Sequence, residues 1–282
     1  MHPTLFHIFS FPVPSYGTML AISFLSGILI AMYLAKKRGL NPDAVSDVGL
    51  YTIVSAIVGA RIYYVMTHFD EFRGNLLSIV NPFQDGRIGI SGLVMYGGFI
   101  AAIVTAALFF KIKKLPVLPY LDVCSPSVGL GIALTRVGCF LNGCCYGLGA
   151  AAGSFLSVNY PNTQSPAGYY QHRILGAPGL LPTQFFESFG GIIIAVTLYL
   201  VGRSKFAFAG LQFYLLIVMY AALRFFIESV RYIETQKIGP FSHNQVICIV
   251  LFLVFGGIIV RKFISVSRIE KKGLKKEGTM IK

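Results

Sequence analysis

The stretch YGTMLAISFLSGILIAMYLA, residues Tyr16 to Ala35, is followed at once by the basic triplet Lys36, Lys37 and Arg38. The stretch itself contains no Asp, Glu, Lys or Arg. A transmembrane α-helix needs about 20 consecutive, mostly apolar residues, and basic residues at its end are typical of the cytoplasmic side. The stretch therefore predicts a membrane-spanning helix whose second end faces the cytoplasm.

Runs of the same kind recur along the 282-residue chain and decide the fold class. The composition is 55% hydrophobic and 12% charged, whereas about 25% of the residues of an ordinary soluble domain are charged. We therefore predict an all-α, polytopic membrane protein that forms one transmembrane domain over residues 1–282. The seven predicted spans are Tyr16–Ala35, Asp47–Thr67, Gly92–Phe110, Leu121–Phe140, Thr183–Gly202, Leu211–Arg231 and His243–Lys262.

The net charge of +13 is unevenly distributed along the chain. Basic residues cluster after the first, third, fifth and seventh predicted spans, whereas the other loops carry few of them. This pattern predicts that the N-terminus lies outside and the C-terminus lies in the cytoplasm, which requires an odd number of spans. The basic tail, residues 263–282, is then best explained as an anchor on anionic lipid, and we expect no nucleic acid partner.

One substantial segment outside the predicted spans, residues 148–182, is rich in Gly, Pro, Tyr, Asn and Gln. The charge pattern places this segment on the outer face of the membrane. Because structureless loops of this length are uncommon in compact domains, we expect a small extracytoplasmic head or a lid over a site.

Three glycines, Gly138, Gly143 and Gly147, follow Arg136 closely in the sequence. Glycines at this density do not favour a continuous helix. The fourth span is therefore expected to be broken, with the chain unwinding or turning between Arg136 and Gly147, where irregular backbone would border a polar cavity. The alternative is a helix that ends near Phe140 and is followed by a glycine-rich exit.

Three arginines, Arg61, Arg136 and Arg224, lie inside apolar segments. An arginine at the centre of a membrane helix costs roughly 2.5–3.5 kcal/mol, so these side chains are expected to face one another, a polar cavity or an anionic ligand. A guanidinium remains charged and presents a planar fork of donors that fits a phosphate, so a lipid phosphate is the natural ligand. The alternative is that Arg61 and Arg224 only pair with carboxylates inside the bundle.

The sixth predicted span carries Tyr220, Arg224, Glu228 and Arg231 on one face, because they recur at spacings of four, four and three. Glu228 can hold Arg224 in one rotamer, or it can accept a proton if burial raises its pKa. We favour the orienting role. Arg231 is expected near the outer interface, where a solvated side chain fits as well as a functional one.

The cysteines Cys139, Cys144 and Cys145 lie close together in the sequence, with Cys124 nearby and Cys248 apart. Their spacing matches neither the usual paired zinc motifs nor a C-x-x-C redox motif. Close helix packing is the favoured interpretation, because cysteine is a small apolar residue. A stabilising disulfide at the outer face and a metal or catalytic role are the alternatives. We predict neither a metal nor a cofactor.

The segment TRVGCFLNGCCYG, residues 135–147, resembles the prolipoprotein diacylglyceryl transferase signature G-R-x-G-N-F-x-N-x-E-x-x-G. Other motifs of this family recur here in the family's order and cover nearly the whole chain. They are Ser15–Gly17, Gly59–Arg61, Gly92–Gly98, Pro182–Glu187 and Tyr220–Arg231.

The resemblance implies a multi-pass enzyme of the bacterial inner membrane. Such an enzyme moves the diacylglyceryl group of phosphatidylglycerol to the lipobox cysteine of a preprolipoprotein, forms a thioether and releases glycerol 1-phosphate. A membrane transporter or lipid translocase that uses the arginines as an anion path is the alternative. Many transporter folds contain two related halves, and no internal repeat stands out here, which disfavours that alternative.

The resemblance also implies roles for individual residues. Arg136 and Arg224 match the family's arginines that act on the reacting headgroup, where they neutralise negative charge on the leaving phosphate. Tyr96 and Glu228 complete the set of candidate catalytic residues. The candidate substrate-binding residues are Tyr16, Arg61, Gly98, Arg136, Asn142, Gly143 and Tyr220.

Tyr96 stands where the family often has histidine, and Cys139 and Cys144 replace the Asn and Glu of the signature. Tyrosine has an unperturbed pKa of about 10 and is a poor base at neutral pH unless nearby arginines lower that pKa. Either Tyr96 is tuned in this way, or it only hydrogen-bonds the headgroup while the lipid phosphate or Glu228 takes the proton. We prefer the second alternative. A further hypothesis is that this chain is a paralogue that has kept the lipid site but altered the chemistry of the acceptor.

Overall fold

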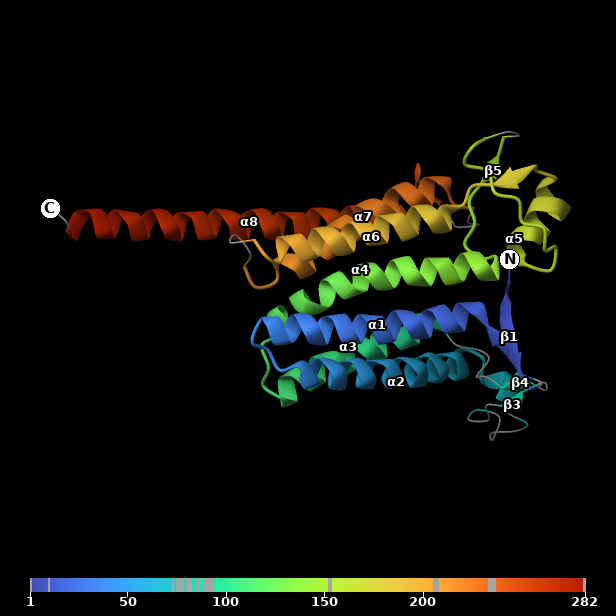
Figure 1. The fold of residues 1–282 in the computed structure, drawn as a ribbon, viewed down its shortest axis with the longest axis horizontal. Helices are drawn as coiled ribbons and strands as arrows, with labels where there is room; N and C mark the ends of the chain where they lie inside the picture. Colours follow the sequence, from blue (N-terminus) through green and yellow to red (C-terminus); the bar gives the residue numbers. More distant parts are fainter. Residues whose placement is uncertain are drawn as a thin grey trace.

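The computed structural model describes residues 2–9, 11–72, 74, 79, 83–84, 87–88, 94–151, 154–204, 208–232 and 237–280. Within these ranges, seven helices are long and apolar enough to cross a membrane, and Figure 1 shows them side by side. The fold class predicted from the sequence is therefore confirmed. The seven helices are α1 (Ser15–Lys37), α2 (Pro42–Thr67), α3 (Met95–Ile112), α4 (Val117–Asn142), α6 (Thr183–Val201), α7 (Leu211–Val230) and α8 (His243–Met280).

The other described elements are short and lie between or before these helices. Three are helical: η1 (Phe69–Phe72), α5 (Pro166–Tyr169) and the π-helix η3 (Tyr170–Leu175). The strands form four antiparallel pairs within the described residues. They are β1 (Thr4–Ile8) with β2 (Phe11–Pro14), β3 (Phe83–Gln84) with β4 (Arg87–Ile88), β5 (Gly149–Ala150) with β6 (Gly179–Leu180), and β7 (Lys237–Ile238) with β8 (Phe241–Ser242).

The predicted spans agree with the helices except at some ends. Helix α2 begins at Pro42 rather than Asp47, because the Asn41 side chain accepts a hydrogen bond from the backbone N–H of Asp43 at 2.9 Å. Asparagine is a preferred N-cap, and the fixed φ of proline suits the first helical position. Helix α8 continues past Lys262 to Met280. Gly92, the predicted start of the third span, lies outside the described residues.

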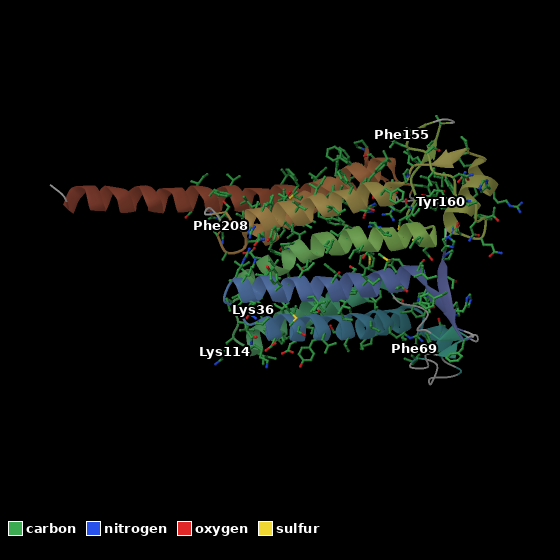
Figure 2. The ribbon with its side chains drawn as sticks, viewed as in Figure 1. Lys36, Phe69, Lys114, Phe155, Tyr160 and Phe208 are labelled. Atoms are coloured by element: carbon green, nitrogen blue, oxygen red, sulfur yellow. The ribbon has the colours of Figure 1, made fainter. Side chains whose placement is uncertain are left out.

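The two ends of the bundle differ. In Figure 1 the N-terminus lies at the end that carries β1, α5 and β5, whereas the C-terminus lies beyond the opposite end, at the tip of α8. Figure 2 shows Lys36 and Lys114 at the end far from Tyr160. The arrangement agrees with an odd number of crossings. The orientation in the membrane, with the N-terminus outside, remains a prediction.

Close backbone contact between α4 and α6 determines how the site is assembled. A Cβ atom added to Gly129 would lie 2.7 Å from the backbone nitrogen of Ala195, and one added to Gly191 would lie 2.8 Å from the carbonyl of Gly129. Small residues at such crossings let membrane helices approach closely. Arg136 lies two turns after Gly129 and Glu187 lies one turn before Gly191, so the same contact faces bring these two charged side chains together.

A buried carboxylate fixes the start of α7 against α4. The Asp122 side chain accepts hydrogen bonds from the backbone N–H groups of Gly210 at 2.6 Å and Phe213 at 3.0 Å. These donors belong to the N-terminal turn of α7, which lacks helical partners and favours a negative charge. The contact holds α7, the helix that carries Arg224, in register with α4.

Helix α4 is continuous through Gly138 and the chain turns only at Gly143, after the helix ends, so the prediction that the fourth span is broken is wrong. Gly138 instead permits close packing, because an added Cβ would lie 2.9 Å from the Cβ of Met19 on α1. The helix ends at Asn142, and Gly143 follows with the left-handed values φ 72° and ψ 37°. The alternative, a helix that ends near Phe140 with a glycine-rich exit, is confirmed.

The described residues of the segment 148–182, which are 148–151 and 154–182, form a small head at the end of the bundle that also carries the N-terminus (Figure 1). The described part contains α5, η3 and the β5–β6 pair, packed around Tyr160, Ala167, Tyr170 and Leu180. Burial raises the pKa of Tyr160 to about 12, so its phenol remains a hydrogen-bond donor at neutral pH. The segment is therefore a folded head and not a structureless linker.

Candidate active site

A partly open cavity of about 1000 Å³ runs between the helices of the bundle. Its walls come from α1, α2, α3, α4 and α7, with Asn244 at the start of α8. Toward the head it is lined by Arg136, and toward the other end by Phe110 and Tyr120. The sixteen positions from Tyr120 to Arg136 correspond to about 24 Å along a helix. A long, mostly apolar cavity with charge at one end fits the shape of a lipid.

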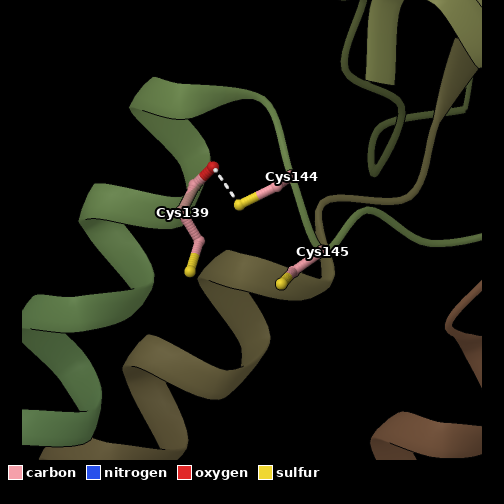
Figure 3. A group of neighbouring side chains, drawn as sticks. All are labelled: Cys139, Cys144 and Cys145. Carbon is pink, nitrogen blue, oxygen red and sulfur yellow. Dashed lines mark hydrogen bonds between the residues drawn. The ribbon is translucent and has the colours of Figure 1, made fainter. Parts of the chain in front are cut away.

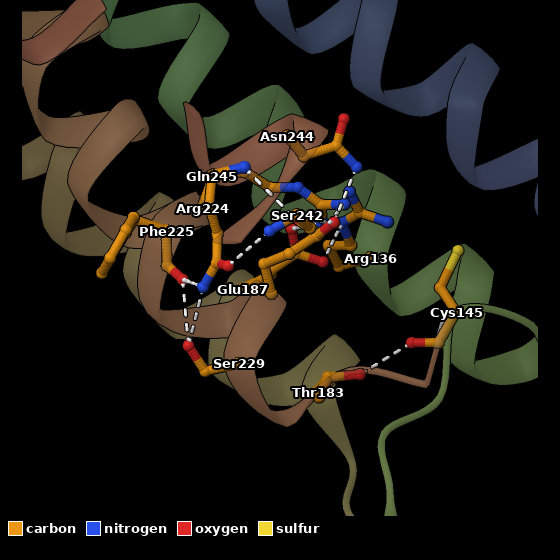
Figure 4. Close-up of polar contacts among 11 residues, drawn as sticks. Arg136, Cys145, Thr183, Glu187, Arg224, Phe225, Ser229, Ser242, Asn244 and Gln245 are labelled. Carbon is orange, nitrogen blue, oxygen red and sulfur yellow. Dashed lines mark hydrogen bonds and ion pairs between the residues drawn. The ribbon is translucent and has the colours of Figure 1, made fainter. Parts of the chain in front are cut away.

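Glu187 joins two arginines at the head end of this cavity (Figure 4). Its side chain is fully buried, with Oε2 2.8 Å from Nε of Arg136 and Oε1 3.0 Å from Nη1 of Arg224. Both arginine side chains remain partly accessible, at 17% and 15% of their surface. The cluster therefore holds two guanidinium groups close together while it leaves each of them partly open to the cavity.

A second carboxylate holds Arg224 from the opposite side. Oε2 of Glu228 lies 2.8 Å from Nη2 of Arg224, across one turn of α7. Oε1 of Glu228 accepts hydrogen bonds from Nδ2 of Asn244 at 2.7 Å and from the Ser242 hydroxyl at 3.3 Å. Glu228 is not among the described residues that line the cavity. Its contacts hold the Arg224 side chain in place, and the favoured orienting role in the reaction stays a prediction.

The charges of the cluster leave it net positive. Three guanidinium groups line the cavity, those of Arg136, Arg224 and Arg231, and two carboxylates, Glu187 and Glu228, are paired with them. One positive charge is thus uncompensated when all five groups are ionised. The Nε atom of Arg231 is buried and has no hydrogen-bond partner in the described part of the chain. The cluster therefore favours a ligand with one negative charge, such as a phosphodiester.

Three cysteines meet beside Arg136. The Sγ atoms of Cys139, Cys144 and Cys145 lie within 4.8 Å of one another (Figure 3), and all three residues line the cavity. Nη1 of Arg136 lies 3.8 Å from Sγ of Cys139. Each cysteine is a free thiol, which does not support the disulfide alternative. Cys139 is buried, as close helix packing predicts, whereas Cys144 and Cys145 are only partly buried.

The turn after α4 explains how the cysteines converge. Gly143 has a positive φ, and Cys145 adopts a φ of 62°, a region that residues other than glycine rarely occupy. The turn is held to α6, because the Thr183 hydroxyl donates to the carbonyl of Cys145 at 2.7 Å and Nε2 of Gln184 donates to the carbonyl of Cys144 at 2.8 Å. The Tyr160 hydroxyl in the head donates to Oε1 of Gln184 at 3.2 Å.

The Cys145 thiol lies in a positive environment outside the membrane-spanning helices. Hydrogen bonds from the Cys139 and Cys144 thiols, together with the nearby guanidinium groups of Arg231 and Arg136, lower the pKa of Cys145. A lowered pKa increases the thiolate fraction, which is the form that binds metals and reacts as a nucleophile.

Five of the predicted site residues line the cavity: Tyr16, Tyr96, Arg136, Tyr220 and Arg224. Tyr96 lies in the first turn of α3 and is 67% exposed. Its location fits a hydrogen bond to a bound headgroup better than the role of a general base.

Arg61 and Gly98 are not brought to the cavity wall that the structure describes. Nε of Arg61 donates to the carbonyl of Ile79 at 2.9 Å, and its guanidinium carbon lies 5.1 Å from the ring centroid of Phe72. Gly98 lets α3 approach α2, because an added Cβ would lie 2.8 Å from the carbonyl of Ala56. The contacts of both residues are those of packing, and their predicted part in substrate binding remains untested.

Asn142 and Gly143 end helix α4 and start the turn that carries the cysteines. The carbonyl of Gly143 accepts a hydrogen bond from the backbone N–H of Ala167 at 2.9 Å, which ties the turn to the head. Neither residue is among the described lining residues, and both belong to the end of α4 from which the cysteine turn begins. Direct contact of Asn142 or Gly143 with substrate remains a prediction.

Glu187 is the site residue that the sequence analysis missed as a functional group. Its motif was noticed, but the carboxylate was not assigned a partner. The signal was present, because an acidic residue inside an apolar span needs a partner for the same reason as an arginine does. Asn244 was also missed, and nothing in its local sequence sets it apart.

The fold and the site together define a polytopic membrane protein with a guanidinium–carboxylate cluster at the end of an internal, lipid-sized cavity. The chain belongs to the prolipoprotein diacylglyceryl transferase family, whose sequence profile matches residues 3–261. It is 32% identical over 277 residues to a phosphatidylglycerol–prolipoprotein diacylglyceryl transferase of Clostridium botulinum strain Hall, covering 96% of this chain and 99% of the relative. Proteins of the same name from Finegoldia magna and Clostridium tetani are 31% and 30% identical, covering 93% and 92% of this chain and 95% and 96% of the relatives.

Proposed function

We propose that this chain transfers the diacylglyceryl group of phosphatidylglycerol to the lipobox cysteine thiol of a preprolipoprotein, with glycerol 1-phosphate as the leaving product. The observation that carries the proposal is the position of the Arg136–Glu187–Arg224 cluster at one end of the long internal cavity. The names of the relatives supply the two substrates, and family membership favours a transferase over a transporter or lipid translocase.

The lipid is held by its charge and by its chains. The phosphodiester of the lipid carries one negative charge, which complements the net positive charge of the cluster. This phosphodiester lies against the accessible sides of Arg136 and Arg231. The acyl chains of the lipid extend along the apolar walls of α1 and α4. Tyr16, Tyr96 and Tyr220 supply hydroxyl groups that can donate to the headgroup oxygens.

The arginines stabilise the leaving group. When the thiol sulfur attacks the glycerol carbon, the bond from that carbon to the phosphate oxygen breaks and negative charge grows on the oxygen. Preorganised donors aimed at such charge contribute about 2.7–4 kcal/mol of transition-state stabilisation in a site that excludes water. Arg224 is held between Glu187 and Glu228, so its side chain needs no further ordering before it contacts the phosphate.

The leaving phosphate is the favoured proton acceptor. Glu228 already accepts hydrogen bonds from two groups and pairs with Arg224, which leaves it as a positioning residue. Tyr96 donates a hydrogen bond to the headgroup. We place the reaction at the outer side of the bacterial inner membrane, since the head and the cluster share the end of the bundle that is predicted to face outward.

The proposal is tested with purified, folded protein in vesicles of phosphatidylglycerol and a synthetic lipobox peptide. Mass spectrometry should detect the thioether peptide, and glycerol 1-phosphate should appear in equal amount. A peptide with serine in place of the lipobox cysteine and vesicles of phosphatidylethanolamine are the controls. Absence of thioether from folded protein contradicts the proposal, and movement of labelled lipid across the bilayer without thioether supports the transporter alternative.

A further inference from the structure

The three cysteines beside Arg136 are not used by the mechanism described so far, although the reaction consumes a thiol. A free cysteine thiol has a pKa of about 8.5, and only its thiolate is a good nucleophile. Tyr96 is an exposed phenol and Glu228 is held by three partners, so neither is placed to deprotonate that thiol. Coordination of a thiol to a metal ion removes its proton without a protein base.

We propose that Cys139, Cys144 and Cys145 bind one zinc ion, whose fourth coordination position takes the lipobox thiol and presents it to the lipid as a thiolate. This inference rests on the proposed transferase function. It assigns the acceptor half of the reaction to the cysteines and the donor half to the arginines.

The distances between the sulfur atoms fit such a site. The three Sγ atoms lie within 4.8 Å of one another. Tetrahedral zinc with Zn–S bonds of about 2.3 Å places its sulfur ligands about 3.8 Å apart, so small rotations of the side chains suffice. The Cys144 thiol donates to the carbonyl of Cys139 at 3.6 Å, a long and weak contact that metal binding can replace (Figure 3).

The backbone around the ligands is already held in place. Cys139 belongs to the last turn of α4, and the carbonyls of Cys144 and Cys145 accept hydrogen bonds from the first turn of α6. These contacts fix the position of the ligands and reduce the ordering that metal binding requires.

A set of three protein ligands leaves one position open, which is the arrangement of catalytic rather than structural zinc. All three cysteines line the cavity, so a ligand that enters the cavity can reach this position. Nη1 of Arg136 lies 3.8 Å from Sγ of Cys139. A phosphate bound by Arg136 would therefore lie next to a thiolate bound by the metal, which is the proximity that the transfer requires.

The charges of the site also favour a metal bound by three thiolates. Such a complex carries one net negative charge and lies beside Arg136, whose Nη1 is 3.8 Å from Sγ of Cys139. The arrangement places a negative nucleophile site beside a positive leaving-group site. Soft thiolate ligands select zinc and copper(I) over magnesium or calcium, and the open tetrahedral position favours zinc.

The step balances without an oxidant or a reductant. The lipobox thiol releases its proton when its sulfur binds zinc. The sulfur then forms a bond to the glycerol carbon while the bond from that carbon to the phosphate oxygen breaks, and the electron pair of that bond goes to the oxygen. Glycerol 1-phosphate takes up one proton overall, zinc remains divalent, and the neutral thioether is a weaker ligand that dissociates.

The first test measures metal rather than activity. Full-length protein is purified in detergent without chelators, and elemental mass spectrometry should find one zinc ion per chain. Replacement with cobalt(II) should produce the visible bands of a tetrahedral thiolate complex, and a lipobox peptide should shift those bands whereas its serine analogue should not. Cys144→Ser and Cys145→Ser should lose the metal and the bands. Cys248→Ser is the matched control, because Cys248 lies on α8 outside the group.

The second test measures whether transfer activity depends on bound zinc. Chelation should abolish thioether formation, zinc should restore it, and binding of phosphatidylglycerol should persist throughout. Full transfer by metal-free protein overturns the zinc proposal and leaves the transferase function standing. Absence of transfer by zinc-loaded protein contradicts the transferase function, whether or not the cobalt bands appear. Stoichiometric copper in place of zinc, or metal content that the cysteine variants retain, also overturns the proposal.

Discussion

Nε of Arg136 lies 2.8 Å from Oε2 of Glu187, and this contact joins α4 to α6 inside the bundle. The same carboxylate contacts Arg224 of α7 through its other oxygen. One fully buried residue therefore holds three helices and two cationic groups in register. Its neighbours on α4 and α6 are small, which lets the two backbones approach closely enough for the pair to form.

Glu187→Gln should lower both transfer activity and thermal stability. The substitution keeps the size of the side chain but removes the charge that compensates Arg136 and Arg224. Breaking a buried ion pair by removing one partner costs about 3–5 kcal/mol. The apparent Tm in detergent and the rate of thioether formation measure the two effects. Glu187→Asp should retain more stability than Glu187→Gln, and equal stability of wild type and Glu187→Gln would contradict the bridging role.

Arg136→Lys should reduce kcat strongly while the protein remains folded. Lysine keeps the positive charge but loses the planar fork that contacts Glu187 and a phosphate together. The loss of one preorganised donor lowers kcat by about 10²–10³-fold. Single-turnover transfer with a lipobox peptide measures the rate, and Arg136→Ala should show no measurable transfer. A wild-type kcat in the lysine variant would show that the Arg136 guanidinium does not act on the reacting groups.

Tyr96→Phe should retain measurable transfer. The variant loses one hydroxyl that can donate to the headgroup but keeps the ring at the start of α3. The main effect is expected on KM for phosphatidylglycerol, because the hydrogen bond forms in the ground state as well as in the transition state. Near-complete loss of kcat in this variant would instead support the tyrosine as the general base.

Gly129→Ala should lower thermal stability and disturb the Arg136–Glu187 contact, although Gly129 lies two helical turns from Arg136. Its Cβ would lie 2.7 Å from the backbone nitrogen of Ala195, so α4 and α6 must separate and the Arg136–Glu187 contact must lengthen. Overpacking of this kind costs about 1–3 kcal/mol. Gly256→Ala on α8 is the control, since nothing lies within 4 Å of its added Cβ. Equal Tm values for the two variants would show that the α4–α6 crossing is not tightly packed.

The sequence predicts the seven spans well, because the length of an apolar run and the basic residues at its end are local properties. It also identifies Arg136 and Arg224, since a charge in an apolar span demands a partner. The sequence does not show which residue is the partner of each arginine. The contact with Glu187 depends on the register between α4 and α6, which is determined by the packing of Gly129 and Gly191.

Two features that the sequence does not reveal share one physical cause. The density of glycines after Arg136 suggested a broken helix, yet Gly138 is a packing position inside a continuous α4. The cysteine spacing matches no usual metal motif, and it does not reveal that Gly143 and the positive φ of Cys145 fold the chain back so that three sulfur atoms meet. Glycine marks both turns and close contacts, and sequence alone does not separate the two uses.

The hydrogen bonds from Tyr160 through Gln184 to the carbonyl of Cys144 have a mechanical consequence. The head and the cysteine turn are joined through the first turn of α6. Whatever fixes the position of the head therefore also fixes the position of the Cys144 backbone beside Arg136.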